Sequence, residues 1–237
     1  MNSHVIDWKR IENFVGYGNA EAAIVFVGME EGLASVDALE SDLLCRSGFK
    51  QVMDVEVAHR CLAKGPRLFT DRPRGQRTWR VMADVMLHFE HQLPQNPAER
   101  RRARTMYRAK YLGRSNGGSL LTELLPYPST STARWPYARF GKFNSRNEYE
   151  SKMLESRVRL LRSAIQDHPR RAIICYGRGD WRYFKLLFPE VKRWNAAGRM
   201  ESAIWNGAKV ALTDHFVTKY FNSDAELDAL SSVALST

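Results

Sequence analysis

The sequence of residues 22–32 is AAIVFVGMEEG, a short apolar run that ends in two carboxylates between two glycines. Its β-branched and aromatic content and its length predict a buried strand over residues 22–27. Further strands are predicted over three runs of similar character, 119–125, 172–176 and 208–213. The stretch SAIW before the last run, joined to it across Asn206-Gly207, predicts a hairpin at that point.

Amphipathic patterns separate these strands. Helices are predicted over residues 7–15, 76–92, 147–167, 180–188 and 223–235. Strands alternating with helices of this length indicate parallel pairing with helices on both sheet faces. The sequence therefore predicts an α/β fold, a three-layer α/β/α domain with a mostly parallel four-stranded central sheet. Because no linker interrupts the apolar residues, we expect residues 1–237 to form a single domain.

Unusual residues follow each predicted strand, where ligands bind in parallel sheets. The four segments are GMEEG (28–32), PYPSTS (126–131), GRGDW (177–181) and DHF (214–216). A carboxylate such as Glu30 can orient water or stabilise a developing cation, and His215 can donate a hydrogen bond to a departing anion. That pair suits cleavage of a glycosidic bond, whose sugar becomes oxocarbenium-like. The alternative is that Glu30 and Glu31 only cap a following helix.

The formal charge of +10 is concentrated in two segments. Residues 64–80 contain six Lys/Arg and one acid, and residues 98–114 contain seven and one, so the rest of the chain is nearly neutral. Basic residues interleaved with Trp79, Tyr107 and Tyr111 predict a nucleic-acid surface, although a solvated helix face and a loop remain an alternative. The side chains that we expect to meet DNA here are Arg72, Arg74, Arg77, Arg101 and Arg104.

Other patterns set limits on the function. The three cysteines, Cys45, Cys61 and Cys175, are odd in number and far apart, which predicts free thiols rather than disulfides or a metal centre. His88 and His91 lack a third ligand, and GRG at 177–179 lacks the rest of a dinucleotide fingerprint, so we expect no metal and no cofactor. No run is long enough for a membrane helix or typical of a secretory signal, which predicts a cytoplasmic protein, and we expect a monomer.

The order of these motifs resembles that of the uracil-DNA glycosylase superfamily. GMEEG (28–32) is similar to the family's first motif in its GMNPG form, and DHFVTKYF (214–221) takes the place of the His-containing second motif and its intercalating loop. In LLTELLPYP (120–128), Glu123 stands where the family carries an Asn for base recognition. The chain departs from the family at Glu31, which replaces Pro, and after His215, where Pro and Ser are absent.

The resemblance implies a role for each of these residues. Glu30 would be the carboxylate that positions water or stabilises the cation, and His215 would donate to the leaving base. The remaining base-binding residues would be Gly28, Met29, Glu31, Gly32, Glu123 and Pro126. Phe216, Val217 or Tyr220 would fill the space that a flipped nucleotide leaves, and Lys219 would contact DNA.

The departures suggest a modified cytosine as the substrate. A carboxylate at Glu123 can accept from the cytosine amino group, and Gly32 would leave the 5-position open. The sequence looks similar to anti-phage glycosylases of this superfamily that attack glucosylated 5-hydroxymethylcytosine. We therefore expect a monofunctional DNA glycosylase that leaves an abasic site. Two alternatives are a non-catalytic nucleic-acid-binding module on the same fold and a hydrolase of free nucleosides.

Overall fold

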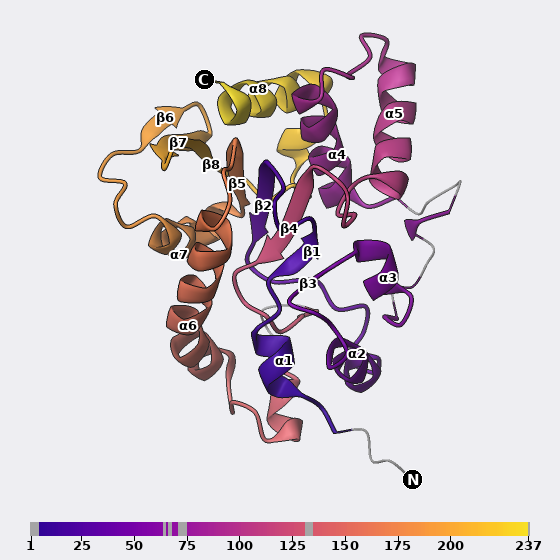
Figure 1. Ribbon diagram of the computed structural model, residues 1–237, viewed down its shortest axis with the longest axis vertical. Coiled ribbons are helices and arrows are strands. Elements are labelled where there is room, and N and C mark those ends of the chain that lie inside the picture. The colour runs from indigo at the N-terminus through magenta and orange to yellow at the C-terminus, as the bar shows by residue number, and fades with distance from the viewer. Residues whose placement is uncertain (1–4, 64, 66–67, 71–74, 131–134, 237) are drawn as a thin grey trace.

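The structure is a computed structural model that describes residues 5–63, 65, 68–70, 75–130 and 135–236 (Figure 1). At its centre is one mixed sheet of eight strands in the order β3-β1-β4-β2-β5-β8-β7-β6. The strands are β1 (Gly16–Gly18), β2 (Ile24–Gly28), β3 (Val52–Met53), β4 (Ser119–Glu123), β5 (Ala172–Tyr176), β6 (Asn195–Ala197), β7 (Met200–Trp205) and β8 (Ala208–Thr213).

The four strands predicted from sequence form the middle of this sheet. β4, β2, β5 and β8 are adjacent and mutually parallel, so their carboxyl ends meet at one edge. The α/β class is confirmed, but the expected mostly parallel sheet of four strands is wrong, because four more strands extend it and three of its pairings are antiparallel. The missed strand β1 contains Gly16 and Gly18, residues that weaken a strand pattern. Gly16 is required by close packing, since a Cβ there would lie 2.2 Å from the Leu121 carbonyl oxygen.

The predicted hairpin is confirmed by β7 and β8, which pair antiparallel. Asn206 and Gly207 between them have φ angles of 49° and 79°. Two consecutive positive φ angles define the two-residue turn that matches the twist of a hairpin, and Asn-Gly is its preferred sequence.

Eight α-helices form within the described residues. Their bounds are α1 (Trp8–Glu12), α2 (Leu39–Arg46), α3 (Val55–His59), α4 (Arg77–Phe89), α5 (Pro97–Lys110), α6 (Arg146–Gln166), α7 (Trp181–Phe184) and α8 (Asp224–Leu235). Side-chain caps begin several of them, including Asp7 before α1 and Ser145 before α6. The helix expected over 180–188 is instead the short α7 between two 3₁₀ turns.

Helices cover both faces of the sheet (Figure 1). Ile24 and Phe26 of β2 pack into a core that includes residues of α4 and α8, whereas Val25 and Val27 pack on the opposite side with residues of α6 and α7. This alternation is the pattern of a strand buried on both faces. None of the helices in the described ranges is both long and apolar enough to cross a membrane.

The expectation of three free thiols is wrong. Cys45 at the end of α2 and Cys61 after α3 form a disulfide with their Cα atoms 5.8 Å apart, whereas Cys175 in β5 is free and buried. The pairing depends on how α2 and α3 pack together, and the spacing of 16 residues in the sequence does not reveal it.

Candidate active site

A cavity of about 380 Å³ lies where the parallel strands β2, β4 and β8 end. Six of the residues predicted to be catalytic or base-binding line it, namely Glu30, Glu31, Gly32, Glu123, Pro126 and His215. They come from three segments that are far apart in the chain, the one after β2, the end of β4 with the residues that follow it, and the one after β8. The volume lies within the range of about 300–1,000 Å³ that is usual for small-molecule sites.

Glu30 has one engaged and one open carboxylate oxygen. Its Oε1 accepts from Arg146 Nη1 at 2.9 Å, and Arg146 also binds Glu150 at the start of α6. Its Oε2 is buried and has no hydrogen-bond partner in the described part of the chain. Burial raises the pKa of Glu30 above the usual 4.5, and the Arg146 guanidinium offsets this only in part. Such a carboxylate is poised to accept a proton from a ligand or a water.

The neighbouring carboxylate, Glu31, has a different environment. Its Oε2 accepts from Arg46 Nη2 at 2.7 Å and from Tyr17 Oη at 2.8 Å. Burial alone would lower the pKa of Arg46, but Glu31 together with Tyr17 and Tyr137 raises that pKa above its usual value. Glu31 is therefore held as the partner of a buried cation. The helix-cap interpretation fits neither carboxylate, since α2 begins at Leu39 and has no side-chain cap.

Glu123 is fixed at the end of β4 from two directions. Its Oε1 accepts from Tyr176 Oη at 2.9 Å, and its backbone carbonyl accepts from Arg157 Nη2 at 2.8 Å. Gly28 on the adjacent strand makes room for this contact, because a Cβ there would lie 2.0 Å from Glu123 Oε2 and 2.5 Å from Tyr176 Oη. Gly28 does not line the cavity itself, so its contribution is to let Glu123 and Tyr176 meet.

His215 presents one ring nitrogen for a ligand. Its Nδ1 accepts from the Val217 backbone N–H at 3.3 Å, so the neutral ring carries its proton on Nε2. The ring packs against Tyr176 with centroids 5.6 Å apart. Burial of this face lowers the pKa of His215 below 6.5, although Asp180 counteracts the change. At neutral pH the imidazole is therefore an uncharged N–H donor.

Like Gly28, the predicted residues Met29 and Phe216 do not line the cavity. Met29 packs between two hydrophobic cores beneath the strand ends and is not a base-binding residue. Phe216 is 1% exposed and stacks on Tyr176 at 4.5 Å, so it cannot act as a DNA wedge. Its neighbour Val217 is 47% exposed and lines the cavity.

The predicted DNA-contacting residues also differ in their surroundings. Arg72 and Arg74 lie outside the described residues. Arg77, Arg101 and Lys219 are exposed, and Arg77 also lines the cavity. Arg104 is 6% exposed and engaged by Asp84 and Asp224, so its role is largely internal.

Several residues that build the site escaped sequence analysis. Arg157 is buried and donates to the backbone carbonyls of Glu12, Phe14, Glu123 and Leu124, which ties α6 to the floor of the cavity. Burial lowers the pKa of Arg157 to about 10. Arg46, Tyr17 and Tyr176 were missed as well. Their partners are 14 to 53 residues away, and no local motif marks such pairs.

Within the ranges that the structure describes, no group of three or more His, Cys, Asp or Glu side chains could hold a metal ion. In comparisons with known proteins, neither a protein-family model nor a curated protein sequence matches this chain. The activity must therefore be inferred from the residues around the cavity.

Proposed function

We propose that the protein is a monofunctional DNA glycosylase of the uracil-DNA glycosylase type, which hydrolyses the N-glycosidic bond of a flipped, modified base. The observation that carries this proposal is that Glu30, with its open carboxylate oxygen, and His215, with its available Nε2–H, line one cavity. These are the two groups that cleavage of a C–N glycosidic bond needs at opposite ends of the breaking bond.

The chemistry uses water as the only co-reactant. The bond between C1′ and the base nitrogen breaks, its electron pair leaves with the base, and positive charge develops on the sugar. The Glu30 carboxylate stabilises that charge and accepts a proton from the water that bonds to C1′. The Nε2–H of His215 donates a hydrogen bond to the departing base anion. The products are the free base, which finally takes up the proton, and an abasic site.

The base edge would be read by Glu123. A carboxylate can accept up to about four hydrogen bonds, so Glu123 can hold Tyr176 and also accept from the amino group of a cytosine. Gly32 is exposed at the rim of the cavity and has no side chain to block a base substituent. These features favour a cytosine with a bulky 5-substituent, and we propose glucosylated 5-hydroxymethylcytosine as the substrate.

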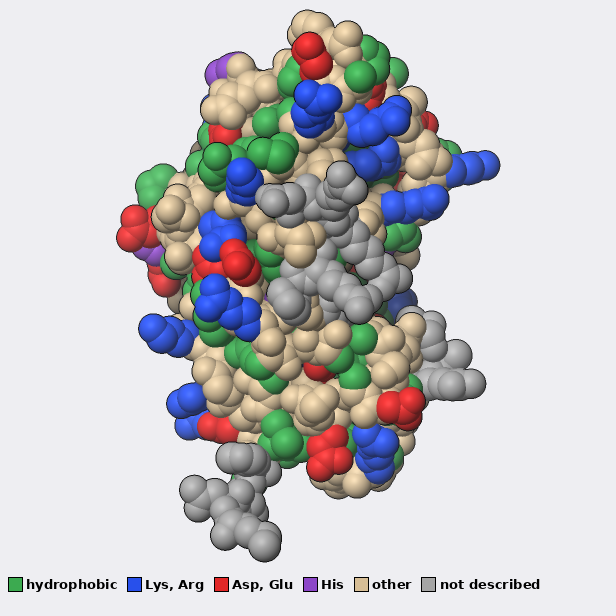
Figure 2. Space-filling view, turned by 90° about the vertical axis from the view of Figure 1, so that its right-hand side faces the viewer, with side chains coloured by type: hydrophobic (Ala, Val, Ile, Leu, Met, Phe, Trp, Pro, Cys, Tyr) green, Lys and Arg blue, Asp and Glu red, His purple; other side chains and the backbone are tan. Residues whose placement is uncertain are grey.

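The rim of the cavity has groups suited to holding DNA. Exposed Arg77 lies beside Val217 and donates to its carbonyl at 3.4 Å, and Lys219 is exposed two residues further on. Val217 is therefore the residue that we propose as the apolar wedge, a role that the sequence also predicted for Phe216. Lys and Arg side chains are abundant on the upper half of the face that contains α4 and α5 (Figure 2).

The test uses three duplexes that differ in a single base: cytosine, 5-hydroxymethylcytosine or its glucosylated form. After incubation with the protein, alkali cleaves any abasic site, and we expect strand cleavage only with the glucosylated base. Equal resistance of all three would contradict the proposed substrate. Salt-sensitive binding with no product from any modified base would favour the non-catalytic module. Release of base from the free glucosylated nucleoside as fast as from the duplex would favour the nucleoside hydrolase.

A further inference from the structure

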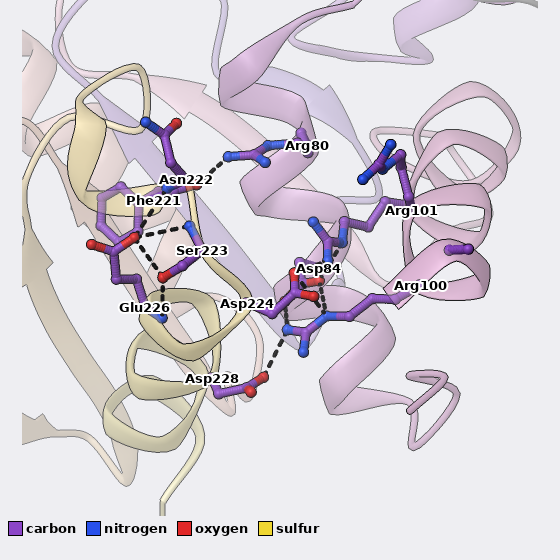
Figure 3. Close-up of polar contacts among 12 residues, drawn as sticks. Arg80, Asp84, Arg100, Arg101, Phe221, Asn222, Ser223, Asp224, Glu226 and Asp228 are labelled. Atoms are coloured by element: carbon purple, nitrogen blue, oxygen red, sulfur yellow. Dashed lines mark hydrogen bonds and ion pairs between the residues drawn. The ribbon is translucent and has the colours of Figure 1, made fainter. Parts of the chain in front are cut away.

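A second cavity, of about 390 Å³, lies between α4, α5 and the turn before α8. Four arginines line it, Arg80 from α4 and Arg101, Arg104 and Arg108 from α5, and we call it the arginine pocket. The other polar side chains in its wall include those of Thr105, Ser223 and Asp224. Figure 3 shows the side chains of this region.

Part of this positive charge is neutralised inside the protein. Arg100 contacts Asp84 at 2.7 Å and Asp228 at 2.7 Å, and Arg104 contacts both Asp84 and Asp224. Asp84 is fully buried, so this network fastens α5 to α4 and α8 (Figure 3). Arg100 and Arg104 are therefore required by the fold.

Arg80 and Arg101 have a different status. Neither makes an ion pair with a carboxylate in the described ranges. Arg80 donates to the Phe221 carbonyl through Nη2, while its Nε is buried without a partner among the described residues. Burial and the nearby Arg104 both lower the pKa of Arg80. Arg101 is exposed, and no contact joins it to the other residues drawn in Figure 3. The pocket thus has guanidinium donors that an anion would satisfy.

The arginine pocket and the candidate active site share two structural elements. On α4, Arg77 lines the active-site cavity and Arg80 lines the arginine pocket, about 4.5 Å further along the helix axis. After β8, His215 lines the first cavity, and Asn222 and Ser223 line the second. Both guanidiniums also bind this segment, Arg77 at the Val217 carbonyl and Arg80 at the Phe221 carbonyl.

We propose that the arginine pocket binds a backbone phosphate of the DNA strand whose target base occupies the active-site cavity. This inference rests on the proposed glycosylase function. A guanidinium presents parallel N–H donors that match two oxygens of a phosphodiester. Arg80 and Arg101 supply the cations, while Arg104 remains bound to its carboxylates. The bound phosphate would fix the register of the strand relative to the active site.

The chain offers a matched pair of variants as a test. Arg101 and Arg102 are adjacent and exposed on α5, but only Arg101 lines the pocket. Binding of unmodified duplex DNA is measured by fluorescence anisotropy over a series of salt concentrations. We expect Arg101→Ala to weaken binding roughly tenfold at low salt, and to reduce the slope of log K against log salt by about 0.9, the value for one lost phosphate contact. Arg102→Ala should change both quantities much less.

A neutral methylphosphonate placed at single positions along the strand identifies the phosphate. One position should weaken binding by the wild-type protein strongly and binding by Arg101→Ala less, because Arg80 still contacts the phosphate in that variant. Inorganic phosphate alone should compete only at far higher concentrations than DNA. The inference would be overturned if Arg101→Ala and Arg102→Ala bound DNA equally. It would also be overturned if the effect of every methylphosphonate simply added to that of Arg101→Ala. Either result would count against it even if the wild type excises bases. If the two variants differ in DNA binding as expected but the wild type excises no base, the phosphate site would stand and the glycosylase function would be rejected.

Discussion

The candidate active-site cavity and the arginine pocket are built on the same helix, α4, and the same segment after β8, yet three glutamates and three arginines line the first, whereas four arginines and one aspartate line the second. In the first, carboxylates face the cavity, and buried donors such as Arg46, Tyr17 and Tyr176 hold two of them. In the second, arginines face the cavity, and carboxylates hold Arg104. In both regions most charged groups are engaged within the protein. The groups open to a ligand are the exceptions, an oxygen of Glu30 in one pocket and Arg80 and Arg101 in the other.

The largest expected effect is on catalysis, in the variant Glu30→Gln. The amide keeps the shape of the side chain and can still contact Arg146, but it cannot accept the proton of water. We expect the rate of base excision to fall by about 10²- to 10⁴-fold, with DNA affinity unchanged within about twofold. Single-turnover kinetics and anisotropy measure the two quantities. A variant that excises at the wild-type rate would show that another group activates the water.

Arg46→Met tests the opposite case, a charged side chain that we expect to stabilise the fold rather than to act on a ligand. The variant leaves the Glu31 carboxylate, whose side chain is 18% exposed, without its buried cation. We expect the free energy of unfolding in urea to fall by about 3–5 kcal/mol. The control is Arg10→Met, because the Arg10–Asp7 pair is about half exposed and should contribute less than about 1 kcal/mol. Equal stability of the two variants would contradict the structural role of Arg46.

The contrast between Glu30 and Glu31 also shows where sequence reasoning stops. The central strands could be predicted because continuous apolar runs such as 22–27 mark strands buried on both faces. Convergence of Glu30, Glu123 and His215 could be predicted because the ends of parallel strands meet at one edge of a sheet. The separate roles of two adjacent glutamates could not, since they depend on Arg46 and Arg146, which reach them from other elements.

The basic segments illustrate the same limit. Residues 98–114 were predicted to form part of a DNA surface from their charge and the interleaved Tyr107 and Tyr111. In the structure, Arg100 and Arg104 face Asp84 within the protein, and Arg114 binds Asp54. The helical phase of α5, its packing against α4 and its ion pairs with α8 separate these internal arginines from exposed Arg101. A charge count does not contain that information.

A smaller loss of activity is expected for His215→Ala. Removing a hydrogen-bond donor aimed at a developing anion lowers the rate by about 10²- to 10³-fold, while the Glu30 carboxylate remains in place. The control Lys219→Ala, also exposed after β8, should weaken DNA binding and leave the single-turnover rate at saturating protein unchanged. If both variants changed only the affinity, His215 would belong to the DNA surface rather than to the chemistry.

The smallest expected effect is that of pH, which should change the rate of base excision but not the DNA binding that the arginine pocket provides. The proposed base excision requires ionised Glu30 and neutral His215. The pKa of Glu30 is raised above 4.5 by burial, so the carboxylate is neutralised at a higher pH than usual, and the pKa of His215 is lowered below 6.5. Lowering the pH from 6.5 towards 4.5 protonates both groups, so the single-turnover rate should fall several-fold over this range.

The surroundings of Glu30 define the controls for this pH profile. Arg146 opposes the shift, while Glu150 and Asp180 add to it, so Glu150→Gln should move the acid limb to lower pH. The guanidiniums of the arginine pocket stay charged throughout this range, and the part of the DNA affinity that Arg101→Ala removes should be the same at pH 5 and pH 7. A rate independent of pH over that interval would mean that neither Glu30 nor His215 takes part in the limiting step.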